Sequence, residues 1–136
     1  MRVSVVLCTH SLDRYDDLLD AADSVRAQTY ENVELVLVSD GNDEVTERFE
    51  WDFDADGDTV VTELPENRGL LKARNHGADA ATGDVVAFLD DDAIADPDWV
   101  AELVEAYEHP GAIAAAGKMV PDRVAGQPGF LPQEVY

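Results

Sequence analysis

The residues best suited to chemistry in this sequence are three consecutive acids, Asp90, Asp91 and Asp92, which follow the apolar residues 85–89. An apolar run of this kind predicts a buried strand, so the three carboxylates cluster at a strand end. Like charges a few ångströms apart oppose ionisation, and a divalent cation removes that cost. Hard oxygen ligands suit Mg²⁺ or Mn²⁺, which also takes substrate phosphate oxygens. The triplet therefore predicts a magnesium or manganese site, with a solvated acidic turn as the alternative.

Two further predicted strands also end in polar residues. Residues 3–8 run into Thr9, and residues 33–38 run through a serine into Asp40. In an open parallel sheet, ligands bind beyond the carboxyl ends of the strands, near the point where the strand order reverses. Three polar strand ends therefore predict one ligand site at this edge.

Alternating strand and helix patterns place these strand ends. Strands are predicted over residues 3–8, 33–38, 59–64, 85–89 and 112–120, and helices over 12–28, 45–51, 69–81 and about 97–108. This order predicts the α/β class with a mostly parallel sheet. Gly83 is expected in the left-handed conformation after the third helix, and Trp51 is expected to anchor the second. Asp96 is the predicted cap of the last helix, with Pro97 at its first position.

The charge balance excludes some partners. The 136 residues, enough for one domain, include 30 acids and 9 bases, for a net charge of −21. Such a chain repels phosphate backbones, so we expect no nucleic acid partner, and an anionic membrane surface is an equally poor fit. An apolar content of 46% predicts a folded domain rather than an acidic tail. Few lysines among so many acids indicate adaptation to high salt, with an ordinary acidic protein as the alternative.

The single cysteine and the lengths of the apolar runs indicate the cellular location that is expected for this chain. Cys8 is the single cysteine, which excludes an internal disulfide or a thiolate metal site. No apolar run reaches the roughly 18 residues of a membrane span. The first eight residues predict a strand rather than a signal peptide. The default expectation is therefore a cytoplasmic location with no membrane span in this chain.

A second acidic pattern, formed by Asp52, Asp54, Asp56 and Glu63, matches the spacing of an EF-hand calcium loop. The second half of the pattern overlaps a predicted strand and runs into Pro65, where no exit helix can begin. The pattern therefore favours an acidic helix-to-strand loop, and calcium binding is the alternative.

The order and spacing of several short stretches resemble family 2 glycosyltransferases, which have the GT-A fold. The resemblance covers about residues 2–120 and rests on the stretches VSVVLCTH, AQTY, ELVLVSDG, NRGL, ARN, ATGD, FLDDD and DPDW. It implies a GT-A-like, Rossmann-like domain over residues 1–120 that binds a nucleotide-sugar. Residues 121–136, rich in proline and glycine, are then expected to be a loop leading to an acceptor-binding half absent from this chain.

The resemblance also assigns roles to the acidic triplet, which matches the DxD motif of the family. Asp92 is implied as the direct ligand of Mg²⁺ or Mn²⁺, with Asp90 as its companion. Asp90 and Asp91 are implied to share the ribose and the water shell of the metal.

Four other residues gain implied roles around the nucleotide. Asp40 matches the acid that binds the nucleobase, commonly uracil, and Thr9 matches a residue beside the base. Asn67 and Arg68 lie in a loop that approaches the nucleotide, where Arg68 meets phosphate. The alternatives are a turn-forming acid for Asp40 and a surface arginine paired with an acid for Arg68. Arg74 is expected to be structural.

The implied activity is inverting transfer from a nucleotide-diphospho-sugar, most commonly a UDP-sugar, to a glycan, lipid-phosphate or protein acceptor. The general base is expected beyond residue 136, so this chain alone is expected to bind donor, and the full-length protein to lie at the inner face of the membrane. Two alternatives remain open. One is a non-catalytic donor-binding relative. The other is a haloacid-dehalogenase-like phosphotransferase with Asp90 as nucleophile, although that motif normally begins its domain.

Overall fold

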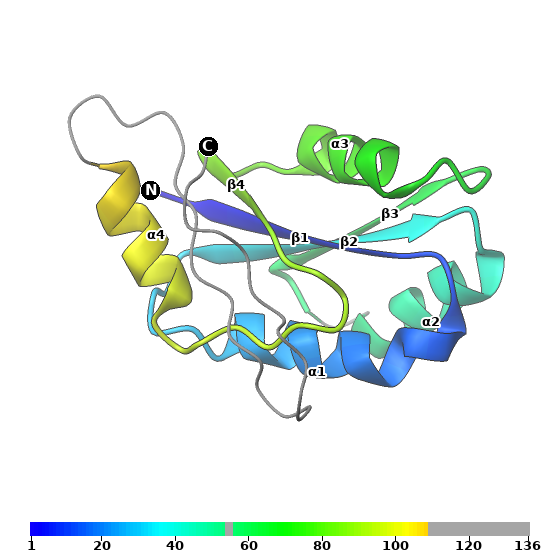
Figure 1. Cartoon of the computed structure of the whole chain (residues 1–136), viewed down its shortest axis with the longest axis horizontal. Coiled ribbons are helices and arrows are strands. Elements are labelled where there is room, and N and C mark those ends of the chain that lie inside the picture. The colour runs from blue at the N-terminus through cyan, green and yellow to red at the C-terminus, as the bar shows by residue number, and fades with distance from the viewer. Residues whose placement is uncertain (54–55, 109–136) are drawn as a thin grey trace, which may run out of the picture.

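The computed structural model describes residues 1–53 and 56–108, which form a single parallel sheet flanked by helices (Figure 1). The strand order is β3-β2-β1-β4, with β1 at Val3–Thr9, β2 at Val33–Asp40, β3 at Thr59–Leu64 and β4 at Val85–Phe88. This confirms the predicted α/β class and parallel sheet. The strand predicted over residues 112–120 and the loop over 121–136 lie outside the described residues.

Helices cover both faces of the sheet. The 3-10 helix η1 spans Leu12–Arg14, and the α-helices are α1 at Tyr15–Arg26, α2 at Asp43–Phe53, α3 at Leu70–Ala80 and α4 at Trp99–Tyr107. Helices α1 and α2 lie on one face and α3 lies on the other (Figure 1). The chain passes from β1 through β2 to β3, and then returns to place β4 on the other side of β1. The strand order therefore reverses between β1 and β4, which is where a ligand is expected.

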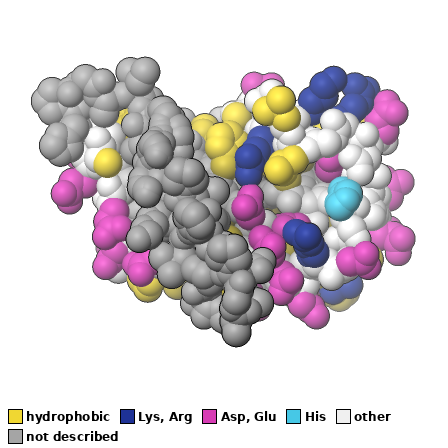
Figure 2. Space-filling view, viewed as in Figure 1, with side chains coloured by type: hydrophobic (Ala, Val, Ile, Leu, Met, Phe, Trp, Pro, Cys, Tyr) yellow, Lys and Arg dark blue, Asp and Glu magenta, His cyan; other side chains and the backbone are white. Residues whose placement is uncertain are grey.

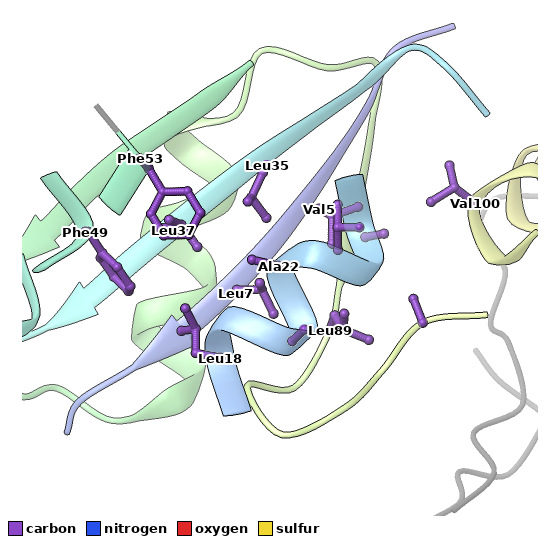
Figure 3. Packing of buried hydrophobic residues seen from close by; sticks show 14 of the residues in the cluster. Val5, Leu7, Leu18, Ala22, Leu35, Leu37, Phe49, Phe53, Leu89 and Val100 are labelled. Atoms are coloured by element: carbon purple, nitrogen blue, oxygen red, sulfur yellow. The ribbon is translucent and has the colours of Figure 1, made fainter. Parts of the chain in front are cut away.

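The core follows the two-residue period of the strands. In β1, Val5 and Leu7 pack with α1 and α2, as Figure 3 shows, whereas Val6 and Cys8 face α3. Helix α3 packs tightly on its face, because a Cβ atom at Gly77 would lie 2.5 Å from a methyl carbon of Val6. All seven residues of β1 are buried, because β1 lies between β2 and β4 and has helices on both faces.

Two predictions about single residues were wrong. Gly83 does not adopt a positive φ, since only Gly41 and Gly69 do so in the described part of the chain. Gly83 is required for space, because a Cβ atom there would lie 2.5 Å from the Ser4 hydroxyl oxygen. Trp51 anchors nothing, since it is 83% exposed. Helix α2 buries Phe49 and Phe53, one turn apart, and this stripe leaves Trp51 facing outward.

Helix α4 begins two residues later than predicted. Asp98 is its N-terminal cap position, and Pro97 lies before the helix rather than in its first turn. The side chain of Asp96 accepts the Asp98 amide at 3.0 Å, which forms a separate turn. The Asp98 carboxylate accepts the Thr29 hydroxyl at 2.8 Å instead of capping the helix. The predicted helix over residues 12–28 is likewise divided into η1 and α1.

Candidate functional site

The carboxyl ends of β2, β1 and β4 lie side by side, and Cys8 lies near the end of β1, the strand between the other two. Burial raises the pKa of Cys8 to about 12; the positive charge of Arg74 opposes this shift, and the negative charges of Asp40, Asp91 and Asp90 add to it. These groups come from the ends of β2 and β4 and from α3, so Asp40, Asp90 and Asp91 all lie near enough to Cys8 for their charges to act on it. Because the Leu89 amide donates to the Val6 carbonyl at 3.1 Å, the chain after β4 stays beside β1 as it enters the triplet.

Asp40 fastens the loop between β3 and α3. Its carboxylate is buried and accepts the backbone amides of Arg68 at 2.8 Å and Gly69 at 3.1 Å. The turn after Asp40 also presses on this loop, since a Cβ atom at Gly41, where φ is 74°, would lie 2.0 Å from the Asn67 nitrogen. The structure therefore brings Asp40 together with the loop that carries Asn67 and Arg68. The amides that Asp40 binds were not foreseen.

The side chains of this loop make local contacts. Asn67 accepts the Gly69 amide at 3.1 Å, which helps the chain turn into α3. Arg68 donates to Glu66 at 3.1 Å and is half-exposed. This pairing with a neighbouring acid is the contact expected of Arg68 in the alternative interpretation.

Thr9 shapes the exit from β1. It is buried, and its hydroxyl donates to the Ser11 carbonyl at 3.3 Å. Ser11 in turn caps η1 by accepting the Asp13 amide at 3.0 Å. Thr9 therefore helps to set the position of η1, which carries Arg14 at its last residue.

The acidic triplet is divided between two arginines. Asp90 accepts from Arg74 of α3 at 2.8 Å, and the Arg74 guanidinium carbon lies 5.6 Å from the centre of the Phe88 ring. One nitrogen of Arg14, Nη1, lies 3.3 Å from an oxygen of Asp91 and 3.5 Å from an oxygen of Asp92. Arg14 had no predicted role. The signal for such a role was the charge balance, since in a chain with 30 acids and 9 bases each base near an acid cluster matters.

The donor set of the triplet fits Mg²⁺ or Mn²⁺. In residues 1–53 and 56–108, no three His, Cys, Asp or Glu side chains are grouped closely enough to hold a metal. Asp91 and Asp92 nevertheless direct one oxygen each at the same cationic nitrogen, so two hard oxygen donors converge on one point. Mg²⁺ needs no more than one or two carboxylates, because waters and substrate phosphates complete its shell.

The acids of the EF-hand pattern have partners of their own. Asp52 lies in α2 and accepts the Tyr15 hydroxyl at 2.6 Å, whereas Glu63 lies in β3 and accepts the Thr46 hydroxyl at 3.0 Å. Helix α2 ends at Phe53 and β3 begins at Thr59, so the pattern is a helix-to-strand connection, as preferred from the sequence. Asp54 lies outside the described residues.

A second buried carboxylate, Glu34, lies near the start of β2, at the end of the strand opposite to Asp40. It accepts the hydroxyl of Ser4 at 2.7 Å, and the amide and hydroxyl of Thr82 at 2.9 and 2.7 Å. Burial alone would raise the pKa of Glu34, but these hydrogen bonds and the charge of Arg2 hold it below its usual value. Glu34 therefore joins β1 and β2 to the connection that leads into β4.

No helix in the described part of the chain combines the length and the apolar character that crossing a bilayer requires.

Comparisons with known proteins agree on one family. The family model for glycosyl transferase family 2 matches residues 4–133. A protein named glucosyl-dolichyl phosphate glucuronosyltransferase, from Haloferax volcanii, is 50% identical over 137 residues, which cover 100% of this chain and 44% of that protein. This chain therefore spans less than half the length of that relative.

Two solved structures share the fold. TarS from S. aureus, in complex with UDP-GlcNAc, matches with a TM-score of 0.67 and 22% identity over 79% of this chain and 31% of that one. The mannosyltransferase PcManGT from Pyrobaculum calidifontis, in complex with GDP-Man and Mn²⁺, matches with a TM-score of 0.64 and 26% identity, over 80% of this chain and 33% of that one.

Proposed function

Because the chain belongs to glycosyl transferase family 2, we propose that it binds the nucleotide-diphospho-sugar donor of an inverting glycosyltransferase, with a divalent cation. The observation that carries this proposal is the side-by-side placement of the carboxyl ends of β2, β1 and β4, which lead into Asp40, Thr9 and the acidic triplet, at the point where the strand order reverses. The Mn²⁺ and GDP-Man named with the mannosyltransferase structure support it.

The acidic triplet is the proposed cation and ribose site. Asp92 contacts Mg²⁺ or Mn²⁺ with Asp90 as its companion, and Asp90 and Asp91 share the ribose and the metal-bound waters. The exposed side chain of Asp92 suits this role, since solvent and substrate reach it. The bound cation supplies Lewis-acid stabilisation of the charge on the departing nucleoside diphosphate.

The other predicted residues surround the nucleotide. Asp40 already accepts two amides, but a carboxylate has about four acceptor positions, so it retains the capacity to accept a nucleobase imide. Thr9 lies beside the base. Asn67 and Arg68 approach the phosphates on the loop that Asp40 fastens, and Arg68 would exchange Glu66 for phosphate.

The donor and acceptor follow from the relatives. UDP-GlcNAc in the TarS structure supports a UDP-sugar, and GDP-Man in the mannosyltransferase structure makes a GDP-sugar the alternative. The name of the Haloferax protein supports a lipid-phosphate acceptor over a glycan or a protein. A lipid-borne acceptor would bring the full-length protein to a membrane surface. We assign no general base to any described residue.

The test is a calorimetric titration of UDP into the chain at high salt, with Mn²⁺ and then with a chelator. Asp92→Ala is the diagnostic variant, and Asp23→Ala, which removes an exposed acid on α1, is the matched control. We expect binding that requires both Mn²⁺ and Asp92, and that survives in Asp23→Ala.

Two outcomes would contradict the proposal. One is a folded chain that binds neither UDP nor GDP with Mn²⁺, and the other is equal binding by Asp92→Ala. Donor binding alone does not separate an enzyme from a non-catalytic relative, and a sugar-transfer assay on a longer protein does. The phosphotransferase alternative gains no support from the family match.

A further inference from the structure

The structure places a side-chain cation between Asp91 and Asp92. A single nitrogen of Arg14 lies 3.3 Å from Asp91 and 3.5 Å from Asp92, so it occupies the point on which both carboxylates converge. We propose that Arg14 is a place-holder for the divalent cation of the donor and gives up this position when that cation binds. The proposal rests on the proposed function and adds a residue that sets how the metal enters.

The charges around Asp91 explain why a place-holder is needed. The Asp91 side chain is only 13% exposed and has an acid on either side in the sequence. A nearby positive charge offsets the repulsion among these neighbouring carboxylates. Arg14 supplies that charge to Asp91, while Arg74 is engaged by Asp90.

The Arg14 side chain is also held less firmly than that of Arg74. Its side chain is 59% exposed, its two contacts are long for charged hydrogen bonds, and it ends a 3-10 helix of three residues. Arg74 is 34% exposed, makes a 2.8 Å contact with Asp90 and lies over the Phe88 ring. Arg74 therefore positions Asp90, whereas Arg14 is held by a weak ion pair that a divalent cation can replace.

Arg14 and a divalent cation compete for the carboxylate of Asp92, the proposed metal ligand, and for the space beside Asp91, the proposed partner of the metal-bound waters. Two positive charges cannot share one point between Asp91 and Asp92, so each lowers the occupancy of the other. Arg14 therefore weakens the binding of a bare divalent cation to the triplet. A cation that arrives with a nucleoside diphosphate brings further oxygen ligands and overcomes this competition.

The test is a titration of the chain with Mn²⁺ alone, in which the electron paramagnetic resonance signal reports free Mn²⁺. The variant is Arg14→Ala. Lys72→Ala is the control for charge, because Lys72 is exposed on α3 and lies outside the triplet. Arg48→Ala is a second control, because Arg48 has similar exposure to Arg14 and pairs with Asp52 at 4.0 Å, although its guanidinium also stacks over the Tyr15 ring. The controls measure how far the loss of any positive charge from so acidic a chain strengthens cation binding.

We expect Arg14→Ala to bind Mn²⁺ about two- to fivefold more tightly than either control, the range that an exposed ion pair allows. Arg14→Lys keeps the charge and is expected to bind Mn²⁺ as the unaltered chain does. Loss of structure at Arg14 would weaken Mn²⁺ binding rather than strengthen it, so the sign separates a place-holder from a structural residue.

Equal or weaker Mn²⁺ binding by Arg14→Ala relative to either control overturns the proposal, as does undetectable Mn²⁺ binding by every variant. A parallel titration of UDP into the unaltered chain at saturating Mn²⁺ tests the proposed function separately. Tighter Mn²⁺ binding by Arg14→Ala together with no UDP binding would uphold Arg14 as the occupant of a cation site and reject the UDP-sugar donor.

Discussion

At the scale of single residues, Asp40 has a structural role that its sequence position did not indicate. Its place at the end of β2 marked it as a ligand-binding acid. The structure shows that the same carboxylate holds the amides of Arg68 and Gly69, 28 and 29 residues further along the chain. No local pattern contains that information, because the partners are backbone groups brought near by folding. Asp40 therefore positions the loop between β3 and α3.

We expect Asp40→Ala to lose about 1–3 kcal/mol of unfolding free energy, because two part-buried amides lose their acceptor. UDP binding should weaken together with this loss. Urea unfolding measures the first effect and calorimetry the second. Hydrogen exchange at the Arg68 and Gly69 amides gives a local measure that global stability does not.

Asp40→Asn is the companion variant, because it retains one acceptor oxygen. Its unfolding free energy and its affinity for UDP should lie between those of the unaltered chain and those of Asp40→Ala. Unchanged exchange at both amides in Asp40→Ala would contradict a fastening role. A loss of UDP binding without any change in the loop would assign Asp40 to the nucleobase alone.

At the scale of elements, the position of β4 depends on the cluster of Ser4, Glu34 and Thr82. Glu34 accepts three hydrogen bonds that join β1 and β2 to the connection preceding β4. The Gly83 amide adds a fourth, to the Ser4 hydroxyl at 2.9 Å. The acidic triplet follows β4 after a single residue, Leu89. This buried cluster at the amino-terminal ends of the strands therefore helps to position the site at their carboxyl ends.

Glu34 makes stability depend on pH in a defined direction. Its pKa is held below the ordinary value of about 4.3, so the ionised form stabilises the fold above that pH. This contribution is lost as the pH falls below about 4.3 and through the lower pKa of the folded state. We expect Glu34→Gln to be less stable near neutral pH by about 1 kcal/mol or more, and to lose less stability on acidification.

The measurement is urea unfolding at neutral and acid pH for both proteins, with Glu50→Gln, an exposed acid on α2, as control. The difference between Glu34→Gln and the control isolates Glu34 from the many other acids that titrate in the same range. Parallel pH profiles for the two variants would contradict a stabilising role of the ionised Glu34.

Secondary structure was predictable where burial dictates the pattern. Apolar runs identified β1 and β2, which are buried almost throughout, and the β-branched and apolar residues of β3 and β4 identified those two edge strands although they are only partly buried. Helix α4 was misplaced because Asp96 forms its own turn and Asp98 binds Thr29. Gly83 was predicted to adopt a left-handed conformation, but a glycine is needed there because a side chain would collide with Ser4, a residue 79 positions away. The errors thus arise where tertiary contacts decide the local geometry.

At the scale of the whole molecule, the same limit applies to the site. Sequence order located Thr9, Asp40 and the acidic triplet at strand ends, because topology alone brings such ends together. Arg14 and Arg74 were not assigned to the site, since an arginine on a helix carries no sign of which acid it will meet. Each arginine has many acids with which it could pair, since acidic side chains outnumber basic ones over the face shown in Figure 2.

The net charge of −21 predicts that salt stabilises the fold. Self-repulsion among the acids favours the expanded chain, and the screening length falls from about 10 Å at 0.1 M salt to about 3 Å at 1 M. Salt also weakens the ion pairs of Arg14 and Arg74, but exposed pairs contribute little. We therefore expect the melting temperature, followed by circular dichroism, to rise with KCl, by roughly 3–6 °C for each kcal/mol regained.

A charge variant separates screening from the general strengthening of apolar burial by salt. Replacing the exposed acids Asp17, Glu47 and Glu105 by their amides removes three negative charges and leaves the core unchanged. If self-repulsion is the cause, this variant melts at a higher temperature in low salt and gains less from added KCl. If salt acts on apolar burial, the variant and the unaltered chain gain equally, and the acidic surface then has no part in the salt dependence.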